Sequence, residues 1–303
     1  MAAIEVPGDR GVKSAIGDAS VESQKKHRRT FSFEFFPAKN DDAKAALRET
    51  IRQLAPLRPA FSSVTFGAGG STRHGTYEAV REIQAAGLDA APHISCIGST
   101  RAALRELLQA YAAIGVNRVV ALRGDRPKDA AATVGELNHP DELVAFIRAE
   151  LGARVHIEVA AYPEFHPESP TPDSDLHYFA RKVRAGANSA ITQYFYNADA
   201  YFRYVEACEA LGLDLAIVPG IMPITNYKQL VRFSDACGAE IPRWIRRRLE
   251  AYGDDLDSIR AFGVDVTTEL CDRLLAGGAP GLHFYTLNRT APTCTIWERL
   301  GLA

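Results

Sequence analysis

The sequence lacks any stretch that could cross a membrane or direct secretion. No run in its 303 residues approaches the roughly 18 consecutive apolar side chains that a membrane-spanning helix needs. The first 20 residues contain no apolar core of the kind found in secretory signals. Thirty-five Lys and Arg residues against 37 Asp and Glu give a formal net charge of −2, so there is no excess positive charge to attract nucleic acid or an anionic membrane. We therefore expect a cytoplasmic protein that binds neither.

Cysteine is also scarce, and its distribution excludes two kinds of scaffold. The five cysteines are scattered, odd in number and form no Cys-x-x-Cys pair, which argues against a disulfide framework and against a structural zinc knuckle. His93 and His166 are accompanied by no His-Glu-x-x-His spacing and no carboxylate-rich cluster. We expect reduced thiols and no metal site.

The sequence is rich in short β-type runs that alternate with helical patterns. The composition is that of an ordinary globular protein, with 47% hydrophobic and 24% charged residues. Each run has six to eight mostly apolar residues, as strands buried on both faces should. The eight runs span residues 31–36, 61–66, 91–97, 118–123, 155–162, 190–196, 216–222 and 282–287.

Helical spacing fills the gaps between these runs. Asn40 provides an N-cap signal for a helix over 41–57, and further helices are predicted over 99–114, 175–185 and 198–211. The long gap before the last strand contains three more patterns, over 226–237, 242–252 and 264–276, and indicates an extra helix inserted there.

This alternation predicts a single (β/α)₈ barrel over residues 31–303. The competing architecture, a doubly wound open sheet, is disfavoured because no dinucleotide fingerprint follows the first strand. The run Gly67–Gly70 resembles one superficially, but position 72 is Thr. Residues 1–30 have few large apolar side chains and are expected to form a mobile leader.

The predicted strands deliver polar residues to one end of the barrel. In such barrels the active site lies at the carboxyl ends of the strands. Seven of the eight strands end in or just before a polar group, namely Glu34, Thr65, His93, Arg123 with Gly124 and Asp125, Tyr162 with His166, Gln193, and Tyr285 with Asn288 and Arg289. We expect these residues to surround a single site.

Glu34 is the most informative member of this set. Four phenylalanines flank it in the segment Phe31–Phe36, and desolvation of the carboxyl group would raise its pKa and make it a proton donor near neutrality. The alternative is a glutamate that forms a salt bridge across the barrel interior. Gly124, which precedes Asp125, would allow the backbone to approach a ligand closely.

Eight segments, in this order, resemble those of bacterial methylenetetrahydrofolate reductases, and the resemblance extends over residues 30–302. They are FSFEFFPAK (31–39), SVTFGAGG (63–70), APHISCI (91–97), ALRGDRP (121–127), AAYPEFHPES (160–169), RKVRAGANSAITQYFY (181–196), VPGIMPITNYKQLVRF (218–233) and HFYTLNR (283–289). The resemblance implies an FAD-containing barrel that reduces 5,10-methylenetetrahydrofolate to 5-methyltetrahydrofolate with NAD(P)H as electron donor, in two half-reactions through the flavin. It also implies self-association into a homo-oligomer.

The resemblance also implies roles for individual residues. Glu34 matches the proton donor, Asp125 and Gln193 match residues near the pterin, and Phe233, Tyr285 and Arg289 match a wall that contacts nicotinamide or folate. The implied flavin contacts are Thr65, His93, Arg123, Gly124, Asp125, Tyr162, His166, Asp175, Arg181 and Lys182, with His139 and Pro140 aligned less closely.

These roles suit the chemistry of the implied reaction. Opening the methylene bridge requires a proton on N10 of the folate, which Glu34 would supply, and the resulting N5 iminium cation would be stabilised by the Asp125 carboxylate. Arg181 and Lys182 could meet the cofactor's phosphates or the negative charge that develops on the flavin. NADH is the expected electron donor. The sequence itself does not distinguish NADH from NADPH, because it has no Rossmann-type acidic residue that would bind the ribose. Two alternatives stay open, a different FAD-barrel oxidoreductase of the proline dehydrogenase type and a flavin-free folate barrel that transfers methyl groups.

Overall fold

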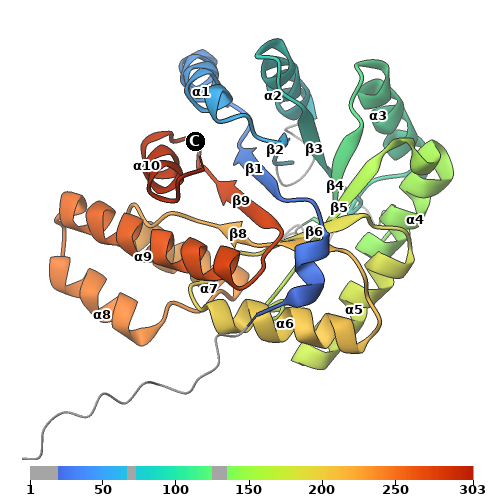
Figure 1. Ribbon diagram of the computed structural model, residues 1–303. Helices are drawn as coiled ribbons and strands as arrows, with labels where there is room; N and C mark the ends of the chain where they lie inside the picture. Colours follow the sequence, from blue (N-terminus) through green and yellow to red (C-terminus); the bar gives the residue numbers. More distant parts are fainter. Residues whose placement is uncertain (1–19, 67–72, 125–134, 303) are drawn as a thin grey trace, which may run out of the picture.

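A computed structural model describes residues 20–66, 73–124 and 135–302, in which nine parallel strands lie inside a layer of helices (Figure 1). The strands are β1 Thr30–Phe35, β2 Phe61–Val64, β3 Ala90–Ser95, β4 Arg118–Leu122, β5 His156–Ala161, β6 Ser189–Thr192, β7 Ala216–Val218, β8 Gly220–Ile221 and β9 Gly281–Tyr285. All eight predicted strands are found, each within a few residues of its expected position.

The predicted barrel is confirmed, with its seventh strand interrupted at Pro219. The order of the strands is β7-β6-β5-β4-β3-β2-β1-β9-β8, so that β7 pairs with β6 while β8 pairs with β9. Proline has no backbone N–H to donate to a ladder, which explains why the seventh strand consists of two short pieces. The Pro219 carbonyl still accepts a hydrogen bond from the N–H of His283, at 2.9 Å, and so helps to close the barrel.

The helices begin and end at the residues that the sequence marks. Asn40 caps α1 by accepting a hydrogen bond from the N–H of Ala43 at 2.8 Å, and Asn226 caps α7 in the same way. Three helices occupy the long gap between β8 and β9, where a regular unit has one. The α-helices are α1 Asp41–Leu54, α2 Arg73–Ala85, α3 Arg101–Ala113, α4 Pro140–Leu151, α5 Pro172–Arg184, α6 Ala198–Ala210, α7 Tyr227–Cys237, α8 Arg243–Tyr252, α9 Leu256–Ala276 and α10 Ala291–Arg299. In the described part of the chain, no helix combines the length and the apolar character needed to span a membrane.

Alternation along β1 separates its side chains between two environments. Phe33 and Phe35 face the helices and belong to the main hydrophobic core, where the Phe33 ring lies 5.5 Å from Trp297 of α10. Ser32 and Glu34 point the other way, into the barrel, where they meet side chains of β3 and β9. A second apolar cluster, formed by Phe61, Ala91, Val120 and Ile191, fills the barrel interior.

The segment before β1 packs against the barrel, which corrects the predicted boundary of the leader. A short 3₁₀ helix, η1 (Glu22–Lys26), follows Val21, which is only 2% exposed. The buried Gln24 side chain donates to the carbonyl of Leu215 at 3.2 Å and accepts from the N–H of Ile217 at 2.9 Å, beside and within β7. Residues 20–30 are therefore part of the folded domain, whereas residues 1–19 lie outside the described residues.

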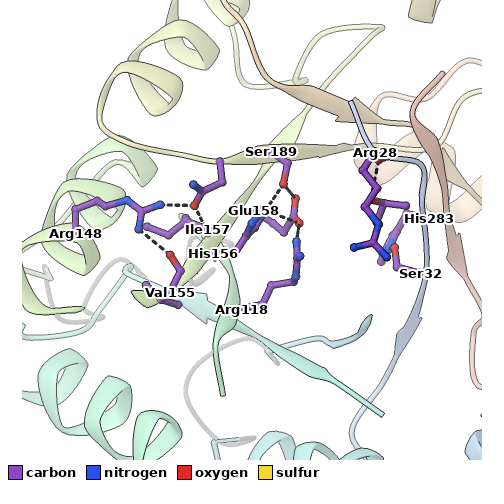
Figure 2. Close-up of polar contacts among 12 residues, drawn as sticks. Arg28, Ser32, Arg118, Arg148, Val155, His156, Ile157, Glu158, Ser189 and His283 are labelled. Atoms are coloured by element: carbon purple, nitrogen blue, oxygen red, sulfur yellow. Dashed lines mark hydrogen bonds and ion pairs between the residues drawn. The ribbon is translucent and has the colours of Figure 1, made fainter. Parts of the chain in front are cut away.

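A polar cluster closes the barrel interior at the amino ends of the strands (Figure 2). Glu158 of β5, 2% exposed, forms an ion pair with Arg118 and accepts a hydrogen bond from Ser189 Oγ at 2.6 Å. His156 Nε2 lies 2.5 Å from the same Ser189 hydroxyl. Burial opposes ionisation of Glu158, but His156 and Arg118 outweigh it and lower the pKa of the carboxyl group. The members of this cluster satisfy one another's hydrogen bonds, and the candidate active site lies at the opposite end of the barrel.

Candidate active site

Glu34 lies between two histidines at the carboxyl ends of the strands. One of its carboxylate oxygens, Oε2, is 3.3 Å from His93 Nε2 of β3 and 3.8 Å from His283 Nε2 of β9. The glutamate side chain is 11% exposed, and that of His283 is completely buried. Barrel closure creates this arrangement, because β1 is paired with β9 on one side and is separated from β3 only by β2.

This arrangement shows that the prediction of a raised pKa for Glu34 is wrong. Burial alone would raise the pKa, but interactions with His283 and His93 outweigh it and lower the pKa of Glu34 to about 2. Phe33 and Phe35 do not surround the carboxyl group, because side chains alternate along a strand and these two face the helices. The alternative of a glutamate paired across the barrel interior describes the structure correctly.

A second group of predicted residues gathers after β4 and β5. The Arg123 guanidinium forms a two-pronged ion pair with Glu168, with distances of 2.7 and 2.9 Å. The rings of Tyr162 and His166 meet edge to face with centroids 4.8 Å apart, and His166 Nδ1 accepts the N–H of Glu168 at 3.0 Å. Burial lowers the pKa of His166, which favours a neutral ring. The structure therefore confirms that Arg123, Tyr162 and His166 lie at one end of the barrel.

Gly124 occupies a position that no other residue could take without rearrangement. Its φ is +87°, and a Cβ atom placed there would lie 2.0 Å from Ser95 Oγ. Asp125, predicted to stabilise the iminium cation, lies outside the described residues. Thr65, just after β2, donates its N–H to the carbonyl of Phe35 at 3.0 Å, and its own carbonyl accepts from Thr76.

Arg181 and Lys182 of α5, both predicted to contact the cofactor, lie in different environments. The Arg181 side chain is half exposed and pairs with Asp141 at 2.7 Å. Lys182 is buried, and its Nζ donates to the carbonyl of Ala160, in β5, at 2.5 Å. Burial lowers the pKa of Lys182 to about 8. Asp175, also buried, accepts a hydrogen bond from Ser169 Oγ at 2.8 Å.

Two of the predicted substrate-binding residues, Gln193 and Tyr285, have side chains engaged near the ends of β6 and β9. The Tyr285 hydroxyl donates to the carbonyl of Thr192 at 2.7 Å, and burial raises its pKa well above the ordinary value. The Gln193 side-chain oxygen accepts from the N–H of Tyr194 at 3.0 Å, and no described residue accepts a hydrogen bond from its amide NH₂.

The other aligned residues lie further along the chain from the strand ends. Arg289 donates to Thr225 Oγ1 at 3.2 Å, and Phe233 lies on α7 under the guanidinium of Arg232. His139 is the N-cap residue of α4. Its backbone N–H and that of Asn138 donate hydrogen bonds to the Glu142 carboxylate. The contacts of the described residues do not join Phe233, Arg289 or His139 to Glu34.

Sequence reasoning missed three residues of this end of the barrel. His283 approaches Glu34 from inside the barrel, Ser32 contacts His283 Nδ1, and Glu168 holds Arg123. A signal for the first two was present, since Ser32 precedes Glu34 by two positions and His283 precedes Tyr285 by two, and residues two apart share a strand face.

The fold and the site define the class of this protein as a single (β/α)₈ barrel with a glutamate flanked by histidines at the carboxyl ends of its strands. The described residues contain no group of three or more His, Cys, Asp or Glu side chains placed to hold a metal ion. Residues 20–301 match the methylenetetrahydrofolate reductase family, and the chain belongs to that family.

Individual relatives agree with this assignment. A 5,10-methylenetetrahydrofolate reductase of Pectobacterium carotovorum is 38% identical over 295 residues, covering 96% of this chain and 95% of the relative. The corresponding protein of Escherichia coli K12 is 37% identical, covering 89% of this chain and 90% of the relative. An Arabidopsis thaliana protein named methylenetetrahydrofolate reductase (NADH) 1 is 37% identical, covering 90% of this chain but 48% of the relative.

A solved structure supports the fold. An uncharacterised Clostridium thermocellum protein that binds two copies of 5-methyl-5,6,7,8-tetrahydrofolic acid aligns with a TM-score of 0.65 at 15% identity. The alignment covers 92% of this chain and 95% of that one.

Proposed function

We propose that this protein reduces 5,10-methylenetetrahydrofolate to 5-methyltetrahydrofolate, with FAD as cofactor and NAD(P)H as electron donor, in two half-reactions. The observation that carries the proposal is the Glu34 carboxyl group between His93 and His283, at the active end of the barrel of a family member. The name of the Arabidopsis relative favours NADH as the donor.

The residues present fit a flavin. Lys182 is a buried cation whose ammonium group can donate three hydrogen bonds, and the described residues provide one acceptor and no ion-pair partner. A buried cation in this state favours an anionic ligand. With Lys182, we propose that Arg123, Tyr162 and His166 hold FAD, which when bound supplies the hydride chemistry that no side chain can provide.

The chain's own part in the folate step is acid catalysis. Glu34 transfers its carboxyl proton to N10 of the folate, the bond between N10 and the methylene carbon breaks with its electrons going to N10, and the N5 lone pair forms the iminium. The free amide of Gln193 can bond the pterin edge. We propose Asp125 as the anion that stabilises the iminium cation.

Glu34→Gln tests this function because it keeps the shape of the side chain and removes the transferable proton. In anaerobic stopped-flow experiments, reduction of the bound flavin by NADH should stay within about tenfold of wild type, since that step needs no proton from Glu34. Reoxidation by methylenetetrahydrofolate should slow by about 10²–10⁴, the range for a lost general acid.

Two results would overturn the proposal. If the wild-type protein showed no flavin absorption after reconstitution, FAD would not be its cofactor. Reoxidation of the Glu34→Gln variant at the wild-type rate would show that another group is the acid.

A further inference from the structure

In the resting site, the proton that is transferred to the folate is not held on Glu34. With a pKa of about 2, Glu34 is a carboxylate at neutral pH before substrate binds. The proposed reaction nevertheless consumes one proton at N10 for each turnover. That proton must therefore be stored next to Glu34 or reach it when the substrate binds.

His283 has the position of a proton store. Its side chain is completely buried, and its Nε2 faces Glu34 Oε2 at 3.8 Å. This Nε2 forms no hydrogen bond with any described residue, so the only acidic group it addresses is the Glu34 carboxylate. The ring lies between Phe61, stacked at 6.0 Å, and Tyr285, edge on at 5.3 Å, which restrict its rotation.

Ser32 controls the other ring nitrogen. Its hydroxyl oxygen lies 2.7 Å from His283 Nδ1, and Ser32 is completely buried (Figure 2). A hydroxyl can turn to donate to a bare Nδ1 or to accept from a protonated one. By accepting from a protonated Nδ1, Ser32 accommodates the ring both with and without a proton on Nε2, while it keeps Nε2 aimed at Glu34.

We propose that His283 is a positioning residue that holds, in the resting enzyme, the proton that Glu34 transfers to the folate, and that Ser32 orients it. This inference rests on the proposed function. When substrate binds, the proton moves from Nε2 to Oε2 of Glu34, which neutralises both groups, and Glu34 then passes it to N10. The ring is left neutral with Nδ1–H donating to Ser32, and one proton from solvent restores the pair through the open end of the site.

The remaining titratable groups that face Glu34 among the described residues are His93 and Tyr285. Tyr285 is engaged with the carbonyl of Thr192. His93 is closer to Glu34 Oε2 than His283 is, but it lies on the side where we expect the flavin, and no described residue forms a hydrogen bond that would orient its ring as Ser32 orients that of His283. We therefore assign the resting proton to His283.

The test is the pH dependence of each half-reaction in FAD-loaded full-length protein. An imidazole binds a proton more strongly than a lone carboxylate does, so the pair keeps its proton to higher pH than Glu34 alone would. We expect the rate of flavin reoxidation by the folate to fall at alkaline pH. In His283→Gln this alkaline limb of the pH–rate profile should move to lower pH by at least one unit, and in Ser32→Ala it should move in the same direction by less. The profile for reduction by NADH should not move. His93→Gln is the comparison variant and should move the folate limb by less than His283→Gln does, although His93 also lowers the pKa of Glu34.

A rate that falls equally at every pH in both variants would indicate a merely structural role and overturn the proposal. If His93→Gln moved the alkaline limb as far as His283→Gln does, the proton would be assigned to His93 instead.

Infrared spectroscopy gives a readout that does not depend on turnover. The C=O stretch of protonated Glu34, identified by its loss in Glu34→Gln, should be absent at pH 5 in the wild type. It should be present in His283→Gln, because burial then raises the pKa of the carboxyl group with less opposition. An unchanged spectrum would overturn the inference. If folate failed to reoxidise the wild-type flavin, the proposed function would fail, while the infrared result would still decide whether His283 controls Glu34.

Discussion

Lys182 shows at the scale of one residue how burial changes the meaning of a charge. It lies one position from Arg181 on α5, and successive helical residues point about 100° apart, so one cation is buried while the other lies at the surface. The buried ammonium group has donors left over, and the exposed guanidinium has Asp141.

Replacement of Lys182 by Met should therefore weaken FAD binding more than it weakens the fold. Loss of a charge-assisted hydrogen bond of about 1.5–3 kcal/mol corresponds to a Kd raised by roughly 10- to 150-fold. The apoprotein should unfold at nearly the wild-type urea concentration, because the change removes a buried charge without an ion-pair partner. Fluorescence titration of the apoprotein with FAD measures the Kd.

Arg184→Met, which removes an exposed cation from the same helix, is the matched control and should leave the Kd within about twofold. Equal FAD affinities in Lys182→Met and wild type would show that Lys182 does not hold the cofactor.

At the scale of elements, η1 takes the place of a neighbouring strand at the amino end of β7. The Gln24 side-chain amide offers one donor and one acceptor, as a backbone peptide does, and binds Leu215 and Ile217 with both. These backbone groups belong to buried residues and would otherwise lack partners at the place where the seventh strand is short.

Gln24→Ala should lower the free energy of unfolding by about 2–4 kcal/mol, because it leaves two buried backbone groups without hydrogen bonds. Equilibrium urea unfolding measures the loss. Lys25→Ala, in the same helix but half exposed, should change the free energy by less than about 0.5 kcal/mol. The folate step should keep its rate per folded molecule, since η1 lies at the amino ends of the strands. A Gln24→Ala protein as stable as wild type would show that η1 is dispensable.

At the scale of the whole molecule, Glu34 links the site to acid stability. Its pKa is lowered from 4.5 to about 2 in the folded protein, so the unfolded chain binds the proton more tightly. The stabilisation is present above pH 4.5 and is lost as the pH falls towards 2. The stability advantage of wild type over Glu34→Gln should shrink by about 1 kcal/mol between pH 6 and pH 3.5.

Urea unfolding of both proteins across this pH range measures the difference. Glu49→Gln is a useful control, because Arg52 and Gln53 lower the pKa of Glu49 at the surface, where concentrated salt should remove any effect. A pH-independent difference between wild type and Glu34→Gln would mean that the histidines do not hold Glu34 in its ionised form.

The positions of strands and helices could be predicted because they depend on neighbouring residues. The apolar run at 118–123 and the N-cap at Asn40 lie where β4 and α1 begin, and the polar residues at the strand ends lie at one end of the barrel. The limits of the leader could not be predicted in this way. The anchor of η1 is a polar residue, Gln24, whose partners in the chain segment 215–217 lie far away in sequence.

The sequence alone determined the alternation of strands and helices, and with it the barrel and the end at which its active site lies. Only the tertiary structure decided what surrounds the Glu34 carboxyl group. Its sequence neighbours are phenylalanines that face the helices, and its spatial neighbours are His93 and His283, brought in by β3 and β9 when the sheet closes. Because the sign of a pKa shift depends on the charges and hydrogen bonds within a few ångströms, it follows from the closure of the barrel and not from the local run of residues.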